Sequence, residues 1–343
     1  MSRPLYCSTA RQLICTALAL LATVCAVASA DAETIKIGII KQTNTGMVFL
    51  AQDRGYFTAE GLTAEIVYFD SSLPIAVATV SGDVDFGVTA NTAGFYQLAG
   101  QGELRIIAGQ VGEVPGYHDQ GWFASSQAYA AGVRSAKDIP GHAVALTSIG
   151  ASSHYTLGLA AEKYGFDLSK VQVLPLQSLG NMVTALVGGR ADFAPMTMAP
   201  ALAQRLDSGE IKLLAWIGDV TPWQFGAVST ATKTANNRHD TVERFLRAYR
   251  KGAADFHAAF ADVAAKRTDN PKTAESIAVI ARNTGQAADQ VAFGNPFVDP
   301  EGRVDVKDVL HQVIWYKAQN MVKGDFDPKI VLDMRYVVPL PEK

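Results

Sequence analysis

The alternation of apolar and polar positions predicts a repeated order of strands and helices in the first part of the chain. Apolar runs at 35–40, 63–69 and 84–88 have the length and β-branched content of strands. Between them, apolar positions at 46–54 and 73–80 recur at helical spacing. This order indicates a βαβαβ unit, which builds a mostly parallel sheet with helices on both faces.

The same order of elements recurs further along the chain. Strands are predicted at 142–146, 171–174 and 191–195, and helices at 152–164 and 179–187. The peptide GDVDF at 82–86 returns as GRADF at 189–193, 107 positions later. A repeated peptide within a repeated order of elements predicts two α/β lobes, each with its own sheet and core.

The last third of the chain has a helical pattern that differs from both lobes. Apolar stripes run through 242–260 and 306–314, the second behind a predicted N-cap at Asp305. This tail lacks strands for a third domain, so we expect it to return to the first lobe. The predicted organisation is lobe 1 at 31–121, lobe 2 at 122–221 and the returning part of lobe 1 at 222–343. Links around 120–125 and 219–228 would form a two-stranded hinge.

The first thirty residues are predicted to be a secretory signal peptide that is removed. They carry Arg3 and Arg11 but no acidic residue, an apolar run at 13–27 and the small residues ASA at 28–30. The alternative, a membrane anchor, would need about 20 apolar residues. All three cysteines lie in this segment, so disulfides, thiolate catalysis and cysteine-bound metals are excluded for the exported chain.

Composition adds two exclusions. The 343 residues are 48% hydrophobic and 18% charged, which excludes a disordered chain. The formal net charge is −3 and no cluster of Lys and Arg is present, so we expect no nucleic-acid partner.

Polar loops follow the predicted strands in both lobes. In α/β sheets, ligands bind beyond the carboxyl ends of the strands, where loops lead into helix N-termini. The loops at 41–46 and 148–153 are rich in Ser, Thr, Asn and Gly, which cap helices and leave backbone N–H groups free. Capping alone would explain one such loop. Two loops on opposed lobes predict a clamp for an anion or a polar group.

The predicted ligand-binding residues are those at the strand ends, together with two tryptophans near the predicted hinge that would form aromatic walls. They are Thr43, Asn44, Thr45, Phe69, Ser71, Ser72, Thr89, Asn91, Thr92, Trp122, Ser148, Gly150, Ser152, Ser153, Gln177, Thr197 and Trp223.

Catalytic and metal-binding patterns are not found. The six histidines show no metal-ligand spacing, and neither a nucleophile elbow nor a phosphate loop is present. We therefore expect no catalytic residue, no metal and no cofactor. His154 is open to two interpretations, a ligand contact or a capping histidine. Asp85 and Asp192 recur in the repeat, and a structural role in holding the turn is favoured.

Four segments resemble one protein family. The run at 46–62 is similar to the A-x-x-x-G-Y-F-x-x-x-G-L segment of nitrate/sulfonate/taurine-type periplasmic substrate-binding proteins. The segment 135–145 is similar to their entry to the second lobe, and the two G-x-[VA]-D-F copies match their strand starts. Members that bind sulfonates or carboxylates often add an arginine in the cleft, and no arginine is identified at a matching position here.

The resemblance implies a type II, two-lobed fold and a periplasmic location. It also implies a small-molecule solute, delivered to an ABC permease with its ATPase subunits, and we expect a monomer. Sulfonates, taurine, nitrate, carboxylates and pyrimidines are the solute classes that the resemblance offers. Two alternatives remain open: an enzyme related to the pyrimidine-synthesis branch of the same fold, and a receptor for a membrane sensor.

Overall fold

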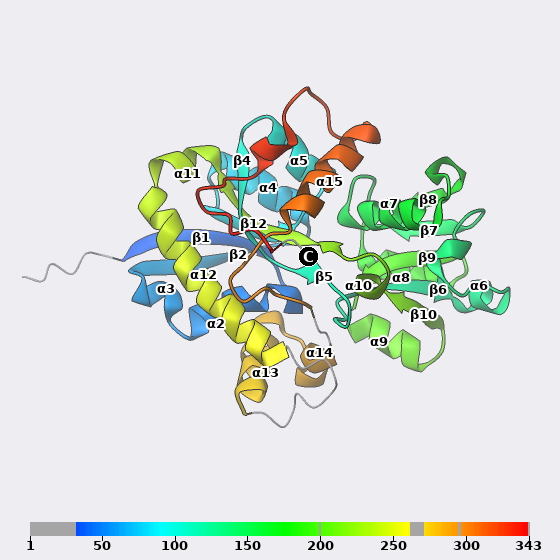
Figure 1. The fold of residues 1–343 in the computed structure, drawn as a ribbon. Coiled ribbons are helices and arrows are strands. Elements are labelled where there is room, and N and C mark those ends of the chain that lie inside the picture. Colours follow the sequence, from blue (N-terminus) through cyan, green and yellow to red (C-terminus); the bar gives the residue numbers. More distant parts are fainter. Residues whose placement is uncertain (1–31, 199, 261–270, 294–295, 342–343) are drawn as a thin grey trace, which may run out of the picture.

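The computed structural model describes residues 32–198, 200–260, 271–293 and 296–341, and the predicted signal peptide lies outside them. Figure 1 shows two sheets side by side, each flanked by helices, with the short strand β5 between them. Within the described parts of the chain, no helix has the length and hydropathy needed to cross a membrane.

The first sheet combines the first predicted unit with two later strands. Its order is β2-β1-β3-β12-β4, in which β2, β1 and β3 are parallel and β12 and β4 are antiparallel to their neighbours. The predicted parallel arrangement therefore holds for the three strands of the βαβαβ unit, and the complete sheet is mixed. The strands are β1 (Glu33–Ile40), β2 (Leu62–Phe69), β3 (Phe86–Ala90), β4 (Leu104–Gly109) and β12 (Gly226–Ala231).

The second sheet repeats this plan, with the order β10-β6-β9-β7-β8. Strands β9, β7 and β8 are parallel to one another, whereas β6 is antiparallel to β9 and β10 is antiparallel to β6. Its strands are β6 (Gln120–Ser125), β7 (Ala143–Leu146), β8 (Gln172–Pro175), β9 (Phe193–Thr197) and β10 (Ile211–Trp216).

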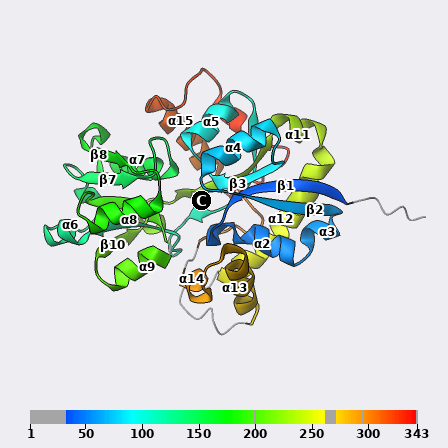
Figure 2. The ribbon, with the colours of Figure 1, turned by 180° about the vertical axis from the view of Figure 1, so that it is seen from behind.

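Helices cover both faces of the first sheet because side chains alternate along its strands. Phe86 stacks on Phe245 of α12, with ring centres 3.8 Å apart, whereas the adjacent Gly87 lies against Ile75 of α4. Figure 2 shows α4 and α5 on one side of the sheet and α2 and α3 on the other. The helices are α2 (Gly46–Asp53), α3 (Tyr56–Ala59), α4 (Ser72–Ser81), α5 (Ala93–Gly100), α6 (Ser126–Ala130), α7 (Ser152–Tyr164), α8 (Leu179–Val187), α9 (Pro200–Asp207), α10 (Ile217–Val220), α11 (Thr232–Asn237), α12 (His239–Phe260), α13 (Pro271–Thr284), α14 (Ala288–Phe293) and α15 (Val306–Ala318).

The repeated aspartates make the same contact between neighbouring strands in both lobes. The main-chain N–H of Lys36 donates to Asp85 Oδ2 at 2.7 Å, and that of Ala143 donates to Asp192 Oδ2 at 2.9 Å. Each aspartate is followed by the parallel strand that pairs with the strand it contacts. A structural role is confirmed for both residues, but their side chains link neighbouring strands instead of holding a turn.

The hinge differs in part from the prediction. Strands β5 (Gly112–Glu113) and β11 (Trp223–Gln224) pair antiparallel as a separate two-stranded sheet. The second link falls where it was expected, within 219–228. The prediction that 120–125 is a link is wrong, because this segment is β6, which lies between β10 and β9 in the second sheet. An apolar run leading into a hinge and a core strand have the same pattern.

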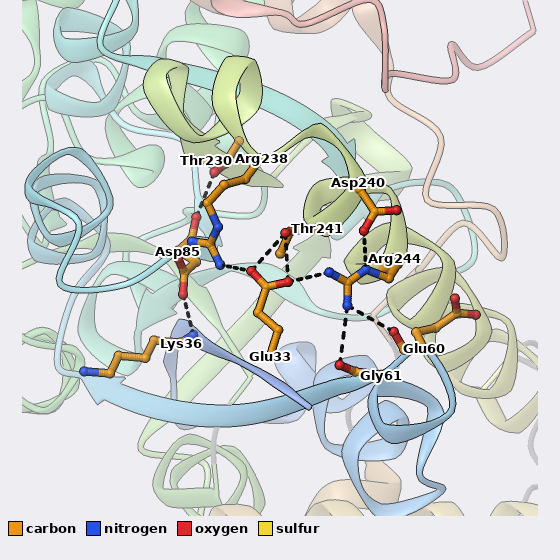
Figure 3. Close-up of polar contacts among 10 residues, drawn as sticks. All are labelled: Glu33, Lys36, Glu60, Gly61, Asp85, Thr230, Arg238, Asp240, Thr241 and Arg244. Carbon is orange, nitrogen blue, oxygen red and sulfur yellow. Dashed lines mark hydrogen bonds and ion pairs between the residues drawn. The ribbon is translucent and has the colours of Figure 1, made fainter. Parts of the chain in front are cut away.

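The returning tail is fastened to the first sheet by charged residues (Figure 3). Glu33 of β1 pairs with Arg238, at 2.6 Å, and with Arg244, and it accepts a hydrogen bond from Thr241 Oγ1 at 3.0 Å. Arg238 also pairs with Asp85. These contacts lower the pKa of Glu33 against the opposing effect of burial.

Helix α15 also reaches the second lobe, which the expected return to the first lobe did not include. Its Trp315 packs edge-on against Tyr155 of α7, with ring centres 5.5 Å apart. Helix α15 therefore connects the two lobes alongside the hinge strands.

Candidate functional site

A cavity of about 790 Å³ lies where the two lobes meet, and we call it the cleft. It is lined by the carboxyl ends of β1 and β3 from the first sheet and of β9 from the second. The loop after β7 and the first turns of α4, α5, α7 and α8 complete the wall. This is the place where α/β sheets bind ligands, and the volume is typical of a small-molecule site.

The structure brings most of the predicted ligand-binding residues together around the cleft. Those that line it are Asn44, Thr45, Ser71, Ser72, Thr89, Thr92, Ser148, Gly150, Ser152, Ser153, Gln177 and Thr197. Five predicted residues lie outside its lining: Thr43, Phe69, Asn91, Trp122 and Trp223.

The two tryptophans do not form walls of the cleft. Trp122 is fully buried in β6, and Trp223 is buried against Tyr155 and Phe225. The region near the hinge is part of the core, so large rings placed there are covered. Phe225, which follows β11 in the chain, is the aromatic residue that reaches the cleft.

The other three residues outside the lining lie close to it. Thr43 donates a hydrogen bond to Gln286 Oε1 at 2.8 Å. Asn91 is buried, and its main-chain N–H donates to the carbonyl of Phe225 at 3.1 Å. Phe69 is the last residue of β2 and contacts the Gly38 position of β1.

Four helices start at the cleft, and their first turns differ in capping. Thr92 caps α5 by accepting from the N–H of Phe95, and Ser178 caps α8 by accepting from that of Asn181. Helices α4 and α7 have no side-chain cap. The N–H groups of the first two residues of each have no partner within the helix, so one helix from each lobe offers main-chain donors to a ligand.

Side chains that line the cleft carry almost no charge. Among the described residues, Asp70 is the one titratable side chain in the lining. His154 lies directly behind the loop at 148–153, and burial lowers its pKa to about 4. Its Nδ1 accepts a hydrogen bond from the N–H of Gly150 at 3.1 Å. The structure thus supports the capping interpretation of His154. No group of three His, Cys, Asp or Glu side chains in the described chain is placed to hold a metal ion.

The floor of the cleft rests on residues that sequence reasoning missed. Gln110 Nε2 donates to the carbonyl of Asn44 at 3.0 Å, and Asn44 Nδ2 donates to Asp119 Oδ2 at 3.3 Å. Asp119 and Glu113 are both buried. Burial raises the pKa of Asp119 to about 7 and, together with the charge of Asp119, raises that of Glu113. No sequence motif identifies Gln110, Glu113 and Asp119, because they lie in the segment that connects the lobes.

The buried carboxyl group of Asp119 should make the stability of the fold depend on pH. A raised pKa stabilises the fold at low pH, and this contribution is lost as the pH rises from about 4 to about 7. Asp119→Asn mimics the protonated acid, so its gain in the free energy of unfolding should be larger at pH 8 than at pH 5, by about 2–3 kcal/mol. Urea unfolding at both pH values measures this. The exposed carboxylate Asp325, changed to Asn, is the control and should show no such difference.

Gln177 lines the cleft in an uncommon backbone conformation. Its φ is +70°, in the left-handed region that favours glycine, and its side chain is exposed at the cleft wall. Non-glycine residues retained in this region are often found at ligand sites. The strain therefore supports a role for this side chain in the cleft.

Replacing Gln177 by glycine should separate stability from binding. We expect the free energy of unfolding to stay level or to rise by up to about 1 kcal/mol, because strain is relieved at the cost of a more flexible unfolded chain. Ligand affinity should fall. Asn320→Gly, at the other positive-φ residue that is not glycine in the described chain (φ +57°), is the matched control and should leave binding unchanged. Equal affinity of both variants for ligand would contradict the role of Gln177.

The closed side of the cleft is held by direct contacts between the lobes. The N–H of Ala93 donates to the carbonyl of Gly150 at 2.9 Å. Tyr316 of α15 donates to the carbonyl of Ala151, the N-cap residue of α7, at 3.0 Å. Helix α15 therefore supports the start of a cleft helix in the other lobe.

A buried carboxylate joins the same helix to the hinge. Asp308 of α15 accepts hydrogen bonds from Tyr155 Oη at 2.9 Å and from the N–H of Gln224 at 2.8 Å. Burial raises the pKa of Asp308 to about 6 against these bonds, which lower it. One side chain thus connects α15, a hinge strand and the second lobe.

Comparison with solved structures shows the fold. The periplasmic aliphatic sulphonate binding protein SsuA from Escherichia coli matches with a TM-score of 0.69 and 18% identity, over 89% of this chain and 98% of that one. The periplasmic nitrate-binding protein NrtA from Synechocystis PCC 6803 matches with a TM-score of 0.64 and 14% identity, over 88% and 85%. The chain therefore has the periplasmic-binding-protein fold, as predicted.

The same fold also occurs in an enzyme. The desulfurization enzyme DSZB matches with a TM-score of 0.57 and 13% identity, over 90% of this chain and 96% of that one. At these identities, structural similarity shows the fold alone.

Sequence comparison gives a family. No curated protein sequence is significantly similar to the chain. The family model described as NMT1/THI5 like matches residues 42–259, which include most of both sheets and all of the described cleft lining except Ile40. Since this match covers more than half of the sequence, the chain belongs to the NMT1/THI5-like family.

Proposed function

We propose that the protein is the periplasmic solute-binding component of an ABC importer. It captures a small organic molecule in the cleft and closes on it. The predicted signal peptide directs the protein to the periplasm, where it acts as a monomer. The observation that carries this proposal is a cleft lined by uncapped helix starts from both lobes, which meet around a two-stranded hinge. A solute that bridges both lobes stabilises the closed form by contacts that the open form lacks.

The lining of the cleft favours binding over catalysis. Among the described residues around it there is no histidine, lysine, arginine or cysteine, so a nucleophile paired with a base is not assembled there. The names of the structural neighbours support import, since SsuA and NrtA are named as periplasmic binding proteins. The occurrence of this fold in the desulfurization enzyme DSZB is the reason to test turnover as well.

Native mass spectrometry of the protein purified from its own periplasm tests the proposal. We expect an added mass that denaturation removes, and a smaller radius of gyration in X-ray scattering when the released solute is added back. The solute should be recovered chemically unchanged. Protein that carries no solute and keeps one scattering profile with every periplasmic fraction would contradict a solute-binding function, and a converted solute would indicate an enzyme.

A further inference from the structure

We propose that the cleft selects an uncharged organic solute with a carbonyl group, such as an amide, a lactam or a urea, over an anion of the same shape. This inference rests on the proposed function and names its substrate class. It follows from the charges and the donors that the cleft presents.

The cleft offers no ion pair to an anion. The lining residues in the described chain include neither lysine nor arginine, and Asp70 adds a negative charge. Lys41, the basic residue next to the lining residues Ile40 and Gln42 in the sequence, has its ammonium group 5.4 Å from the ring centre of Tyr68. His154 is buried and neutral behind the loop at 148–153. An anion would therefore lose its hydration without gaining an opposite charge.

The helix starts do not replace a cationic side chain. The first turns of α5 and α8 are already capped by Thr92 and Ser178. Helix α4 begins two residues after Asp70, so the loop that leads into α4 carries a carboxylate, which disfavours an anion there. The start of α7 remains, where the N–H groups of Ser152 and Ser153 have no partner within the helix. These donors also bind an uncharged carbonyl oxygen, which loses much less hydration than a charged oxygen on entering the cleft.

The other polar groups of the lining are suited to an amide. In the part of the chain that the structure describes, five carboxamide side chains line the cleft: Gln42, Asn44, Gln110, Gln120 and Gln177. Each has both a donor and an acceptor, as do the surrounding hydroxyl groups. A solute with a carbonyl acceptor and an N–H donor can pair with such a wall without leaving a buried charge unpaired. Leu73, Ile149 and Phe225 provide apolar surface for the rest of the molecule.

Calorimetric titration with matched compounds tests the proposal. The probes are nicotinamide against nicotinate, and benzamide against benzoate and benzenesulfonate, each added to protein from which bound solute has been removed. We expect each amide to bind at least about tenfold more tightly than its anionic partner. The affinity for the amides should change by less than about twofold between low salt and about 0.3 M NaCl.

A charge added to the cleft wall should reverse this preference. Gln177 is exposed at the wall, so Gln177→Arg should fold normally, which circular dichroism checks. We expect the ratio of benzoate to benzamide affinity to rise at least about tenfold in this variant. Tighter binding of benzoate or benzenesulfonate to the unaltered protein would overturn the proposal, and so would no binding of either amide. An unchanged ratio in Gln177→Arg would overturn it too. Anion binding with compaction would leave the proposed import function standing.

Discussion

Gly158→Ala is expected to lower the free energy of unfolding by about 2–3 kcal/mol. Gly158 lies within α7, where an added Cβ would be 2.3 Å from the indole ring of Trp315 in α15. Such a distance requires the two helices to move apart. The direction of this change identifies its cause, because replacing glycine by alanine at an exposed helix position raises the free energy of unfolding by about 1 kcal/mol. Urea unfolding monitored by circular dichroism measures the change.

Two comparisons isolate the cause. Gly180→Ala in α8 is the matched control, since its nearest neighbour beyond the adjacent residues is Ser178 Oγ at 3.9 Å, and it should be neutral or stabilising. In a Trp315→Leu background, the cost of Gly158→Ala should fall by at least about 1 kcal/mol, because the ring that the Cβ meets is gone. An undiminished cost in that background would show that the contact between α7 and α15 is not the cause.

The elements that were predicted well have a clear local signal at one end or the other. Helices α7 and α8 have the predicted bounds of 152–164 and 179–187. Ser178 caps α8, and Gly165 ends α7 with a φ of +71°. These signals act within one turn of the chain, so no tertiary information is needed to place them.

The sequence placed the segment after residue 222 with the first lobe, but it could not supply that this segment adds a strand inside the first sheet. Strand β12 follows the second lobe in the chain but lies between β3 and β4 of the first sheet. That position depends on how the lobes meet, and no pattern within β12 reports it. For the same reason Trp122 and Trp223 were assigned to the cleft, whereas the packing around the hinge buries both.

The candidate site was predictable to the extent that it follows from topology. Strand ends and helix starts must lie at one edge of a parallel sheet, which placed Thr45, Thr89 and Ser152 correctly around the cleft. Gln110 and Gln120 come from segments next to the hinge and enter the cleft because of its three-dimensional path. The missing arginine, noted from the sequence, becomes informative once the lining is known.

Ser152→Pro is expected to weaken solute binding by about 10–100-fold, because proline removes the main-chain N–H that α7 offers to the cleft. Proline fits this position, since Ser152 is the first residue of the helix and Ala151 before it has φ −67° and ψ 165°, which a following proline allows. The unfolding midpoint should therefore change little. Calorimetric titration with the solute recovered from the periplasm measures the loss of affinity.

Ser152→Ala separates the main-chain donor from the side chain. It keeps the N–H and loses the hydroxyl group, so its affinity should remain within about threefold of the unaltered protein if the main chain does the binding. Equal losses in the two variants would instead assign the contact to the hydroxyl group. Full affinity in Ser152→Pro would show that the solute does not use the N–H at the start of α7. Closure would then need another bridge between the lobes.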